Sequence, residues 1–219
     1  MKVILFGATG MVGQGALREC LLDDAVEAVL TVGRTPTGQQ HAKLRELAHA
    51  DLHDFTAIES ELSGYDACFF CLGVTSAGLT EAEYRRVTVD IAVAAGRTLA
   101  RLNPGMTFVF ISGAGADSTG TSRTMWARVK GEAENAILAL PFKAAYALRP
   151  AFIQPMHGIR SKTRSYRVLY AIFWPLMPLV KLLFPGSVTT TERLGKAMLK
   201  IAQHGSPLRI LESRDINAQ

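Results

Sequence analysis

Short apolar runs alternate along the chain with longer segments in which apolar residues recur every three or four positions. The runs are bounded by Gly, Asp or Pro, which is typical of buried strands, and they cover residues 3–6, 28–32, 67–71, 107–111 and 144–148. A weaker strand pattern covers residues 44–50. Helical periodicity begins near Met11, Thr80, Ser122 and Thr191. With right-handed crossovers, this alternation predicts an α/β fold built on a doubly wound parallel sheet.

The alternation stops after Pro150. Residues 151–189 contain a long apolar stretch interrupted by prolines, and an ordinary helix follows over residues 191–202. We expect one domain over residues 1–219, in which residues 151–189 form a small helical annex that closes a substrate pocket over the sheet. Residues 208–211 are predicted to add a last strand.

The composition agrees with a single buried core. The chain has 219 residues, of which 48% are hydrophobic and 20% charged, which excludes a disordered, collagen-like or coiled-coil protein. Three cysteines form no even disulfide framework, so a reducing compartment fits best. The first apolar run continues directly into a glycine motif, and no export signal is predicted. We therefore expect a cytoplasmic protein.

The net charge of +5 is unevenly distributed, because residues 135–191 contain seven basic residues and no acidic one. A basic C-terminal segment on a slightly acidic body indicates an anionic ligand or an acidic surface. Binding of nucleic acid is not expected, since the sequence lacks base-stacking motifs in which aromatic and basic residues alternate. A small-molecule substrate is the expected partner, and no metal site is predicted.

Glycines at positions 7, 10 and 13 follow the first strand and open the first helix. In such a turn the first glycine allows the tight bend, the second lets the backbone approach a pyrophosphate, and the third lets the helix pack on the strand. The alternative is a glycine-rich turn without a ligand, but the β-α-β context favours dinucleotide binding. The residues expected to contact the cofactor here are Gly7, Thr9, Gly10, Met11, Val12 and Gly13.

The residue that recognises the adenosine ribose is expected at the end of the second strand. This chain has no carboxylate at that place and carries Arg34 instead. A guanidinium binds phosphate through paired donors, which favours NADP(H) over NAD(H); the alternative is that Arg34 is a solvated loop residue. Asp51 and Leu52, after the third strand, are candidate contacts for the edge of the adenine.

The turn Gly-Ala-Thr-Gly-Met-Val-Gly resembles that of the short-chain dehydrogenase/reductase superfamily, and more closely that of its atypical and extended branch of epimerase-like and NmrA-like proteins. The resemblance covers about residues 1–155 and implies an NAD(P)-binding Rossmann fold. Cys71, Leu72 and Gly73 resemble the family's loop beside the cofactor. Pro150 belongs to a turn that resembles the one against which the family's nicotinamide lies.

The same resemblance implies catalytic roles for two residues. Ser112 stands where the family has its catalytic serine, and Lys130 stands in the helix that carries the catalytic lysine. Ser112 would polarise a substrate carbonyl, while Lys130 would hold the nicotinamide ribose and lend positive potential. The alternatives are that Ser112 is only a turn residue and that Lys130 is a solvated helix lysine.

The chain departs from the family one helical turn before the lysine, where Trp126 replaces the catalytic tyrosine. An indole N–H donates a hydrogen bond but does not exchange its proton near neutral pH. Three interpretations stay open. The proton could come from another source, namely Ser112, a water held by Ser112 and Lys130, or Tyr166 or Tyr170. Alternatively, the protein could sense redox state without turnover, or Trp126 could stack on a substrate whose reaction needs no tyrosine. An NADPH-linked oxidoreductase or epimerase-type enzyme is narrowly favoured.

An apolar stretch over residues 168–185 contains one charge and follows a cluster of basic residues at 160–167. Its prolines disfavour a continuous membrane-spanning helix. Packing on the sheet, a hydrophobic pocket or a subunit contact is preferred, and peripheral membrane contact through residues 160–185 is the alternative. A homodimer is expected only by analogy with the superfamily.

Overall fold

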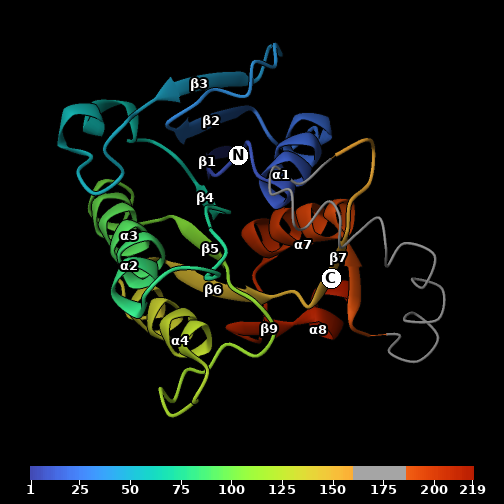
Figure 1. Cartoon of the computed structure of the whole chain (residues 1–219). Helices are drawn as coiled ribbons and strands as arrows, with labels where there is room; N and C mark the ends of the chain where they lie inside the picture. Colours follow the sequence, from blue (N-terminus) through green and yellow to red (C-terminus); the bar gives the residue numbers. More distant parts are fainter. Residues whose placement is uncertain (160–185) are drawn as a thin grey trace.

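One central sheet of seven parallel strands organises the computed structural model, which describes residues 1–159 and 186–219. The strands lie in the order β3-β2-β1-β4-β5-β6-β9 (Figure 1). They are β1 (Lys2–Phe6), β2 (Ala28–Gly33), β3 (Leu44–Ala48), β4 (Ala67–Phe70), β5 (Thr107–Ile111), β6 (Ala144–Arg149) and β9 (Ile210–Glu212). The order reverses between β1 and β4, and doubly wound sheets bind their ligands at this point.

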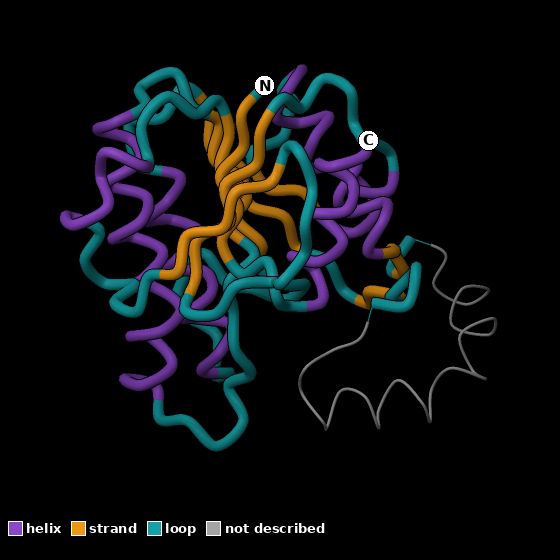
Figure 2. The backbone as a smooth tube through the Cα atoms, turned by 90° about the horizontal axis from the view of Figure 1, so that it is seen from above, coloured by secondary structure: helices purple, strands orange, loops and turns teal. Residues whose placement is uncertain are grey.

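Helices cover both faces of the sheet (Figure 2). The longer ones are α1 (Met11–Leu22), α3 (Ile91–Leu102), α4 (Met125–Leu138) and α7 (Thr191–His204). Successive side chains of β1 point to opposite faces, so Ile4 and Phe6 join the core beneath α3 and α4, while Val3 and Leu5 join the core beneath α1 and α7. Burial on both faces explains why the central strands are continuous apolar runs in the sequence.

The fold class predicted from the sequence is confirmed, with small shifts at the ends of elements. β3 ends at Ala48 and β4 ends at Phe70, slightly before their predicted ends. α4 begins at Met125 rather than near Ser122, because the Ser122 N–H donates to the Asp117 carboxylate at 2.6 Å and is part of the preceding loop. The last strand covers residues 210–212 rather than 208–211.

The two described ends of the annex pair as strands rather than helices. β7 (Phe152–Gln154) and β8 (Val188–Thr190) form a separate parallel pair. Strands of three residues are too short to produce a periodic pattern, so they were not predicted. Residues 160–185 lie outside the described part of the chain, and with them the basic cluster, Tyr166 and Tyr170, and the predicted membrane contact. In the ranges 1–159 and 186–219, no helix is both long and apolar enough to span a bilayer.

The helix before β5 contains an irregular turn. α2 (Glu81–Arg85) starts with a capping box between Thr80 and Glu83, and it continues through η2 (Arg86–Asp90), a π-helical turn, into α3. Thr88, inside this turn, is buried. The short elements η1 (Thr56–Glu61) and α8 (Ser213–Asn217) complete the described chain. η2 packs against α4, the helix that carries Lys130.

Candidate functional site

The three glycines of the first turn have different neighbours. A Cβ on Gly7, whose φ is +75°, would lie 2.6 Å from the amide nitrogen of Leu72, and a Cβ on Gly13 would lie 2.1 Å from the Gly7 carbonyl oxygen. Packing of the protein itself therefore requires these two glycines. A Cβ on Gly10 would meet only the Gly7 oxygen, at 3.3 Å. At Gly10 the protein itself excludes a side chain less strongly than at Gly7 and Gly13, which fits a glycine that lets a phosphate approach closely.

The amino end of α1 is left without a compensating group. Its N-cap residue, Gly10, provides no side-chain hydrogen bond, and the first turn contains no acidic residue. The N–H groups of Met11 and Val12 have no acceptor within the helix, because the first turn of any helix leaves such groups unpaired. The Gln14 amide donates to the Thr9 carbonyl at 3.1 Å and steadies the turn. These residues therefore fit a pyrophosphate, which favours the positive end of a helix dipole.

Arg34 is exposed directly after β2. No hydrogen bond or ion pair engages its guanidinium within residues 1–159 and 186–219. The loop after Arg34 is held by Glu46 of β3, whose carboxylate accepts hydrogen bonds from the N–H groups of Thr37 at 2.5 Å and Gly38 at 3.0 Å. Burial alone would raise the pKa of Glu46, but these hydrogen bonds lower it below its ordinary value. An ionised Glu46 thus fixes the loop that follows Arg34.

The two residues predicted to contact the adenine differ in environment. Leu52 is 5% exposed and belongs to the core cluster that contains Phe6 and Phe55. Asp51 is exposed, and its carboxylate accepts the N–H of His53 at 2.9 Å. The side chain of Leu52 therefore packs in the core, which the strand pattern in the sequence did not reveal. The side chain of Asp51 lies at the surface.

The loop after β4 lies against the glycine turn. The Cys71 N–H donates to the Phe6 carbonyl oxygen at 3.0 Å, and Leu72 is the neighbour that excludes a side chain at Gly7. Burial raises the pKa of the Cys71 thiol, which therefore stays neutral and lines the loop rather than acting as a nucleophile. Gly73 follows at the surface.

Lys130 reaches the carboxyl end of β5, which Ser112 follows in the chain. The Lys130 Nζ donates to the Ile111 carbonyl oxygen at 3.2 Å and lies 5.1 Å from the centre of the Phe110 ring. Ser112, the next residue, is 9% exposed, and its Oγ has no hydrogen-bond partner within residues 1–159 and 186–219. Burial lowers the pKa of Lys130 to about 8, although the nearby Glu134 carboxylate acts in the opposite direction. The site thus combines an unused hydroxyl with an ammonium group of weakened basicity.

Trp126 lies one helical turn before Lys130, on the same face of α4. A Cβ on Gly115 would lie 3.4 Å from Cη2 of Trp126, so the indole ring rests against the loop that follows β5. The ring is partly buried and also packs on the core beneath α4. Pro150, after β6, is buried, and its carbonyl accepts the Ala114 N–H at 3.1 Å. The loops after β5 and β6 therefore meet beside Trp126.

A buried ion pair beneath the site was not predicted from the sequence. Glu134 is fully buried and accepts two hydrogen bonds from Arg149, at 2.8 and 2.6 Å, and one from the Ser118 hydroxyl at 2.9 Å. Burial would raise the pKa of Glu134, but Arg149, Ser112 and Ser118 lower it. The Ser112 hydroxyl is near enough to favour the carboxylate, yet its geometry is not that of a hydrogen bond. No local pattern in the sequence indicated this pair, because Arg149 comes from β6 and Glu134 from α4.

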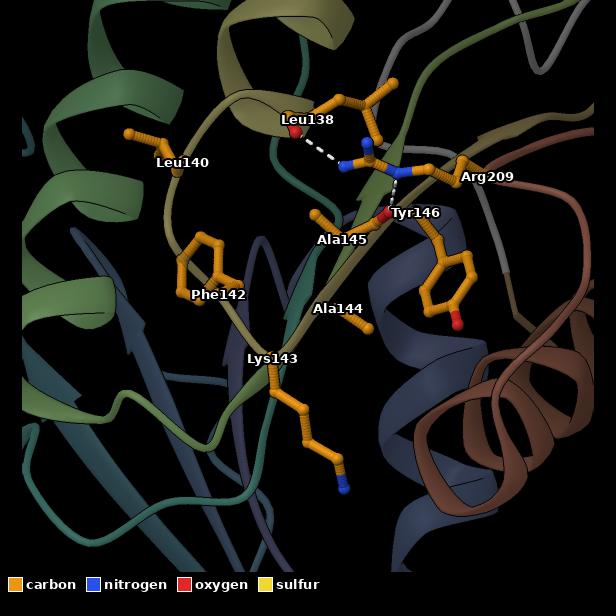
Figure 3. A pocket seen from close by; sticks show the side chains of 8 residues that line it. All are labelled: Leu138, Leu140, Phe142, Lys143, Ala144, Ala145, Tyr146 and Arg209. Atoms are coloured by element: carbon orange, nitrogen blue, oxygen red, sulfur yellow. Dashed lines mark hydrogen bonds between the residues drawn. The ribbon is translucent and has the colours of Figure 1, made fainter.

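A cavity of about 430 Å³ lies at the amino end of β6 (Figure 3). Phe142 and Tyr146 line it, together with Arg209. Arg209 donates to the carbonyl oxygen of Leu138, the last residue of α4, at 2.5 Å, where a cation stabilises the helix end. The glycine turn and Ser112 lie at the carboxyl ends of their strands, so this cavity is at the other edge of the sheet and separate from the candidate site.

Comparison with known proteins agrees with this geometry. Residues 3–125, more than half of the chain, match the NAD dependent epimerase/dehydratase family. The chain belongs to this family. Membership places it in the NAD(P)-binding Rossmann superfamily that includes the short-chain dehydrogenases/reductases, so the resemblance carried by the glycine turn is confirmed.

Curated relatives span most of the chain. Protein FMP52-2 of Scheffersomyces stipitis is 32% identical over 163 residues, which are 74% of this chain and 69% of the relative. The fmp52 protein of Emericella nidulans is 30% identical over 182 residues, or 78% of this chain and 74% of the relative. Both are named mitochondrial. The expectation of a cytoplasmic protein is therefore contradicted. Free cysteines indicate a reducing environment but do not separate the cytosol from other compartments that keep thiols reduced.

Solved structures with low sequence identity share the fold. Gre2 of Candida albicans, in complex with NADPH, has a TM-score of 0.72 at 14% identity and covers 97% of this chain and 77% of its own. MoeE5, in complex with UDP-glucose and NAD, has a TM-score of 0.67 at 17% identity, and the match covers 97% of this chain and 75% of MoeE5. Both nicotinamide cofactors thus occur among the structural neighbours of this family member.

Proposed function

We propose that this family member is an NADP(H)-linked oxidoreductase or epimerase-type enzyme acting on a small apolar carbonyl or sugar-like substrate. The observation that carries the proposal is the Lys130 ammonium bound to the carbonyl of Ile111, next in the chain to Ser112, whose buried hydroxyl makes no hydrogen bond within the described residues. A buried hydroxyl without a partner costs free energy, and such a cost is retained where a ligand supplies the missing partner. Gly10, where the protein excludes a side chain less strongly than at Gly7 and Gly13, supports binding of the dinucleotide at the glycine turn.

Each residue has a defined task in this proposal. When bound, NADPH supplies a hydride. The amino end of α1 binds the pyrophosphate, and Lys130 binds the nicotinamide ribose. Ser112 donates a hydrogen bond to the oxygen of the substrate carbonyl and stabilises the negative charge that develops there. Cys71, Leu72 and Pro150 line the cofactor from the neighbouring loops.

A preference for NADPH is supported by the exposed Arg34 guanidinium at the end of β2. A paired, charge-assisted interaction with the 2′-phosphate contributes about 1.5–3 kcal/mol. Arg34→Glu is therefore expected to weaken NADPH binding by roughly tenfold to a hundredfold and to change NADH binding little. Fluorescence titration with both cofactors measures this. Arg97→Glu is the matched control, because Arg97 is exposed on α3 and the change of charge is the same.

The possible outcomes distinguish the presence of a cofactor site from its preference for NADPH. If the wild type binds neither cofactor, the proposed function fails. If Arg34→Glu and Arg97→Glu both bind NADPH like the wild type, the cofactor site stands but Arg34 does not read the 2′-phosphate.

A second candidate function is a redox-sensing protein that binds the dinucleotide without turnover. Trp126 favours it, because an indole cannot act as the family's tyrosine acid. This function requires a partner whose affinity differs between the NADPH-bound and the NADP⁺-bound protein. It loses its support if no partner distinguishes the two forms and a carbonyl compound is reduced above the rate without protein.

A further inference from the structure

Lys130 occupies the place where the loops after β4 and β5 meet. Its Nζ lies 3.2 Å from the Ile111 oxygen, and a Cβ on Gly73 would be 3.9 Å from it. An ammonium group has three N–H donors, and the Ile111 carbonyl is the acceptor that the described chain gives it. Ser112 follows Ile111 directly, so the Lys130 ammonium is held at the residue next in the chain to Ser112.

No carboxylate forms an ion pair with Lys130 in the described ranges. Glu134, one turn further along α4, is the acidic group that acts on it, but Arg149 and Ser118 already occupy both carboxylate oxygens. A lysine in a tight ion pair would hold its proton. Instead, the Lys130 ammonium donates to the Ile111 carbonyl oxygen and lies over the face of the Phe110 ring.

Two arginines on neighbouring elements are engaged elsewhere, and the nearby cysteine carries no charge. From α2, Arg85 is engaged by Asp90 and Glu132. Arg128 of α4 is paired with Glu81. At the end of β4, Cys71 stays neutral because burial raises the pKa of its thiol. Glu134 is therefore the ionised neighbour against which Lys130 titrates.

We propose that Lys130 is the proton donor of the reaction, in place of the phenol that Trp126 removes. This inference rests on the function proposed above. The carbonyl carbon receives the hydride that reduced nicotinamide supplies, and the C=O π bond opens toward oxygen. The oxygen forms its new O–H bond with a proton from the Lys130 Nζ, whose N–H bond breaks, while Ser112 holds that oxygen. The neutral amine then takes a proton from solvent.

The partial burial of Lys130 supports this role. Desolvation lowers the pKa of its ammonium to about 8, and a general acid works best when its pKa lies near the working pH. An exposed lysine with an ordinary pKa near 10.4 would be a much weaker acid.

One test follows protonation of Lys130 without requiring turnover. The protein is labelled with ¹³C at the lysine Cε, saturated with NADP⁺, and titrated by NMR, with the Lys130 signal assigned by its loss in Lys130→Arg. We expect a midpoint near pH 8. A midpoint above about pH 10, the ordinary value for a solvated lysine, overturns the proposal. NADPH titration of the same samples reports separately on the cofactor site.

A second test distinguishes a role of the Lys130 positive charge from a role of Lys130 as proton donor. Lys130→Arg keeps a positive charge and N–H donors, but a guanidinium does not release its proton. We expect the variant to bind NADPH while its kcat with a panel of aldehydes, ketones and quinones falls by about a hundredfold or more. Lys143→Arg, an exposed lysine by the cavity at the other edge of the sheet, is the matched control and is expected to behave like the wild type.

Two kinetic results contradict the inference. If Lys130→Arg retains kcat within about tenfold, less than a general acid contributes, Lys130 acts through its charge alone. If the wild type binds NADPH but reduces no compound of the panel, proton donation by Lys130 is overturned while the cofactor site stands. Failure of the wild type to bind NADPH removes the proposed function itself.

Discussion

At the scale of single residues, Ser112 combines a cost in stability with a candidate role in function. Its hydroxyl is buried and finds no partner in the described chain, which costs about 1–3 kcal/mol. The hydroxyl of Ser118, in the following loop, has two hydrogen-bond partners, since it donates to Glu134 and accepts from Arg149 at 2.7 Å. The two serines form a natural comparison.

Ser112→Ala is expected to leave the free energy of unfolding unchanged or to raise it by about 1 kcal/mol, because the change removes an unsatisfied polar atom. Ser118→Ala is expected to lower it by about 1–3 kcal/mol, because it takes a hydrogen bond from a buried carboxylate. Chemical denaturation measures both. A loss of stability in Ser112→Ala as large as that in Ser118→Ala would show that the Ser112 hydroxyl has a structural partner.

Residues whose role depends on the local chain were predictable, and those whose role depends on packing were not. Gly7, Gly10 and Gly13 follow from their spacing after a strand. Leu52 stays a predicted contact of the adenine, but the sequence pattern did not show that its side chain lies in the core. Glu134 looked like an ordinary helix glutamate, because its partner Arg149 is supplied by a distant strand.

At the scale of elements, the Glu134–Arg149 pair fastens α4 to β6 beneath the candidate site. Arg149 also reaches Glu212 at the end of β9, at 3.1 Å. The same helix carries a more exposed pair, Glu132 with Arg85, on its other side. Removing one partner of a buried pair leaves an uncompensated charge, whereas an exposed pair is largely replaced by water.

Glu134→Gln is expected to lower the free energy of unfolding at pH 7 by about 3–5 kcal/mol, and the control Glu132→Gln by less than about 1 kcal/mol. The folded state holds the pKa of Glu134 below its ordinary value, so the stability it contributes is present above the unfolded pKa, roughly 4.3. That contribution is lost as the pH falls through the lower, folded pKa. Urea denaturation at pH 7 and pH 3 should therefore show a smaller difference between wild type and Glu134→Gln at pH 3. An equal or larger difference at pH 3 would contradict the assignment.

Periodic elements were recovered from the sequence because each buries a repeating face. The strands of the sheet and the helices after β1, β4, β5 and β8 all have such faces. The β7–β8 pair and the π-helical turn were not recovered. Their residues are too few for a repeat, and their form is set by the elements they contact.

At the scale of the whole molecule, binding at the glycine turn is linked to the stability of the entire fold. A ligand that binds only the folded state stabilises it by about 2.7 kcal/mol at a hundred times its Kd. In a chain of this size, about 1 kcal/mol raises Tm by roughly 2–4 °C. NADPH is therefore expected to raise the Tm of the wild type by several degrees.

Gly10 makes the most direct test of the central claim, that the amino end of α1 binds a dinucleotide. A Cβ at Gly10 meets only the Gly7 oxygen, at a tight 3.3 Å, so Gly10→Ala should lose much less Tm than Gly13→Ala, whose Cβ would strike backbone at 2.1 Å. The measurement is the rise in Tm on adding saturating NADPH. We expect a rise of several degrees for the wild type and almost none for Gly10→Ala. An equal rise in both proteins would contradict the claim.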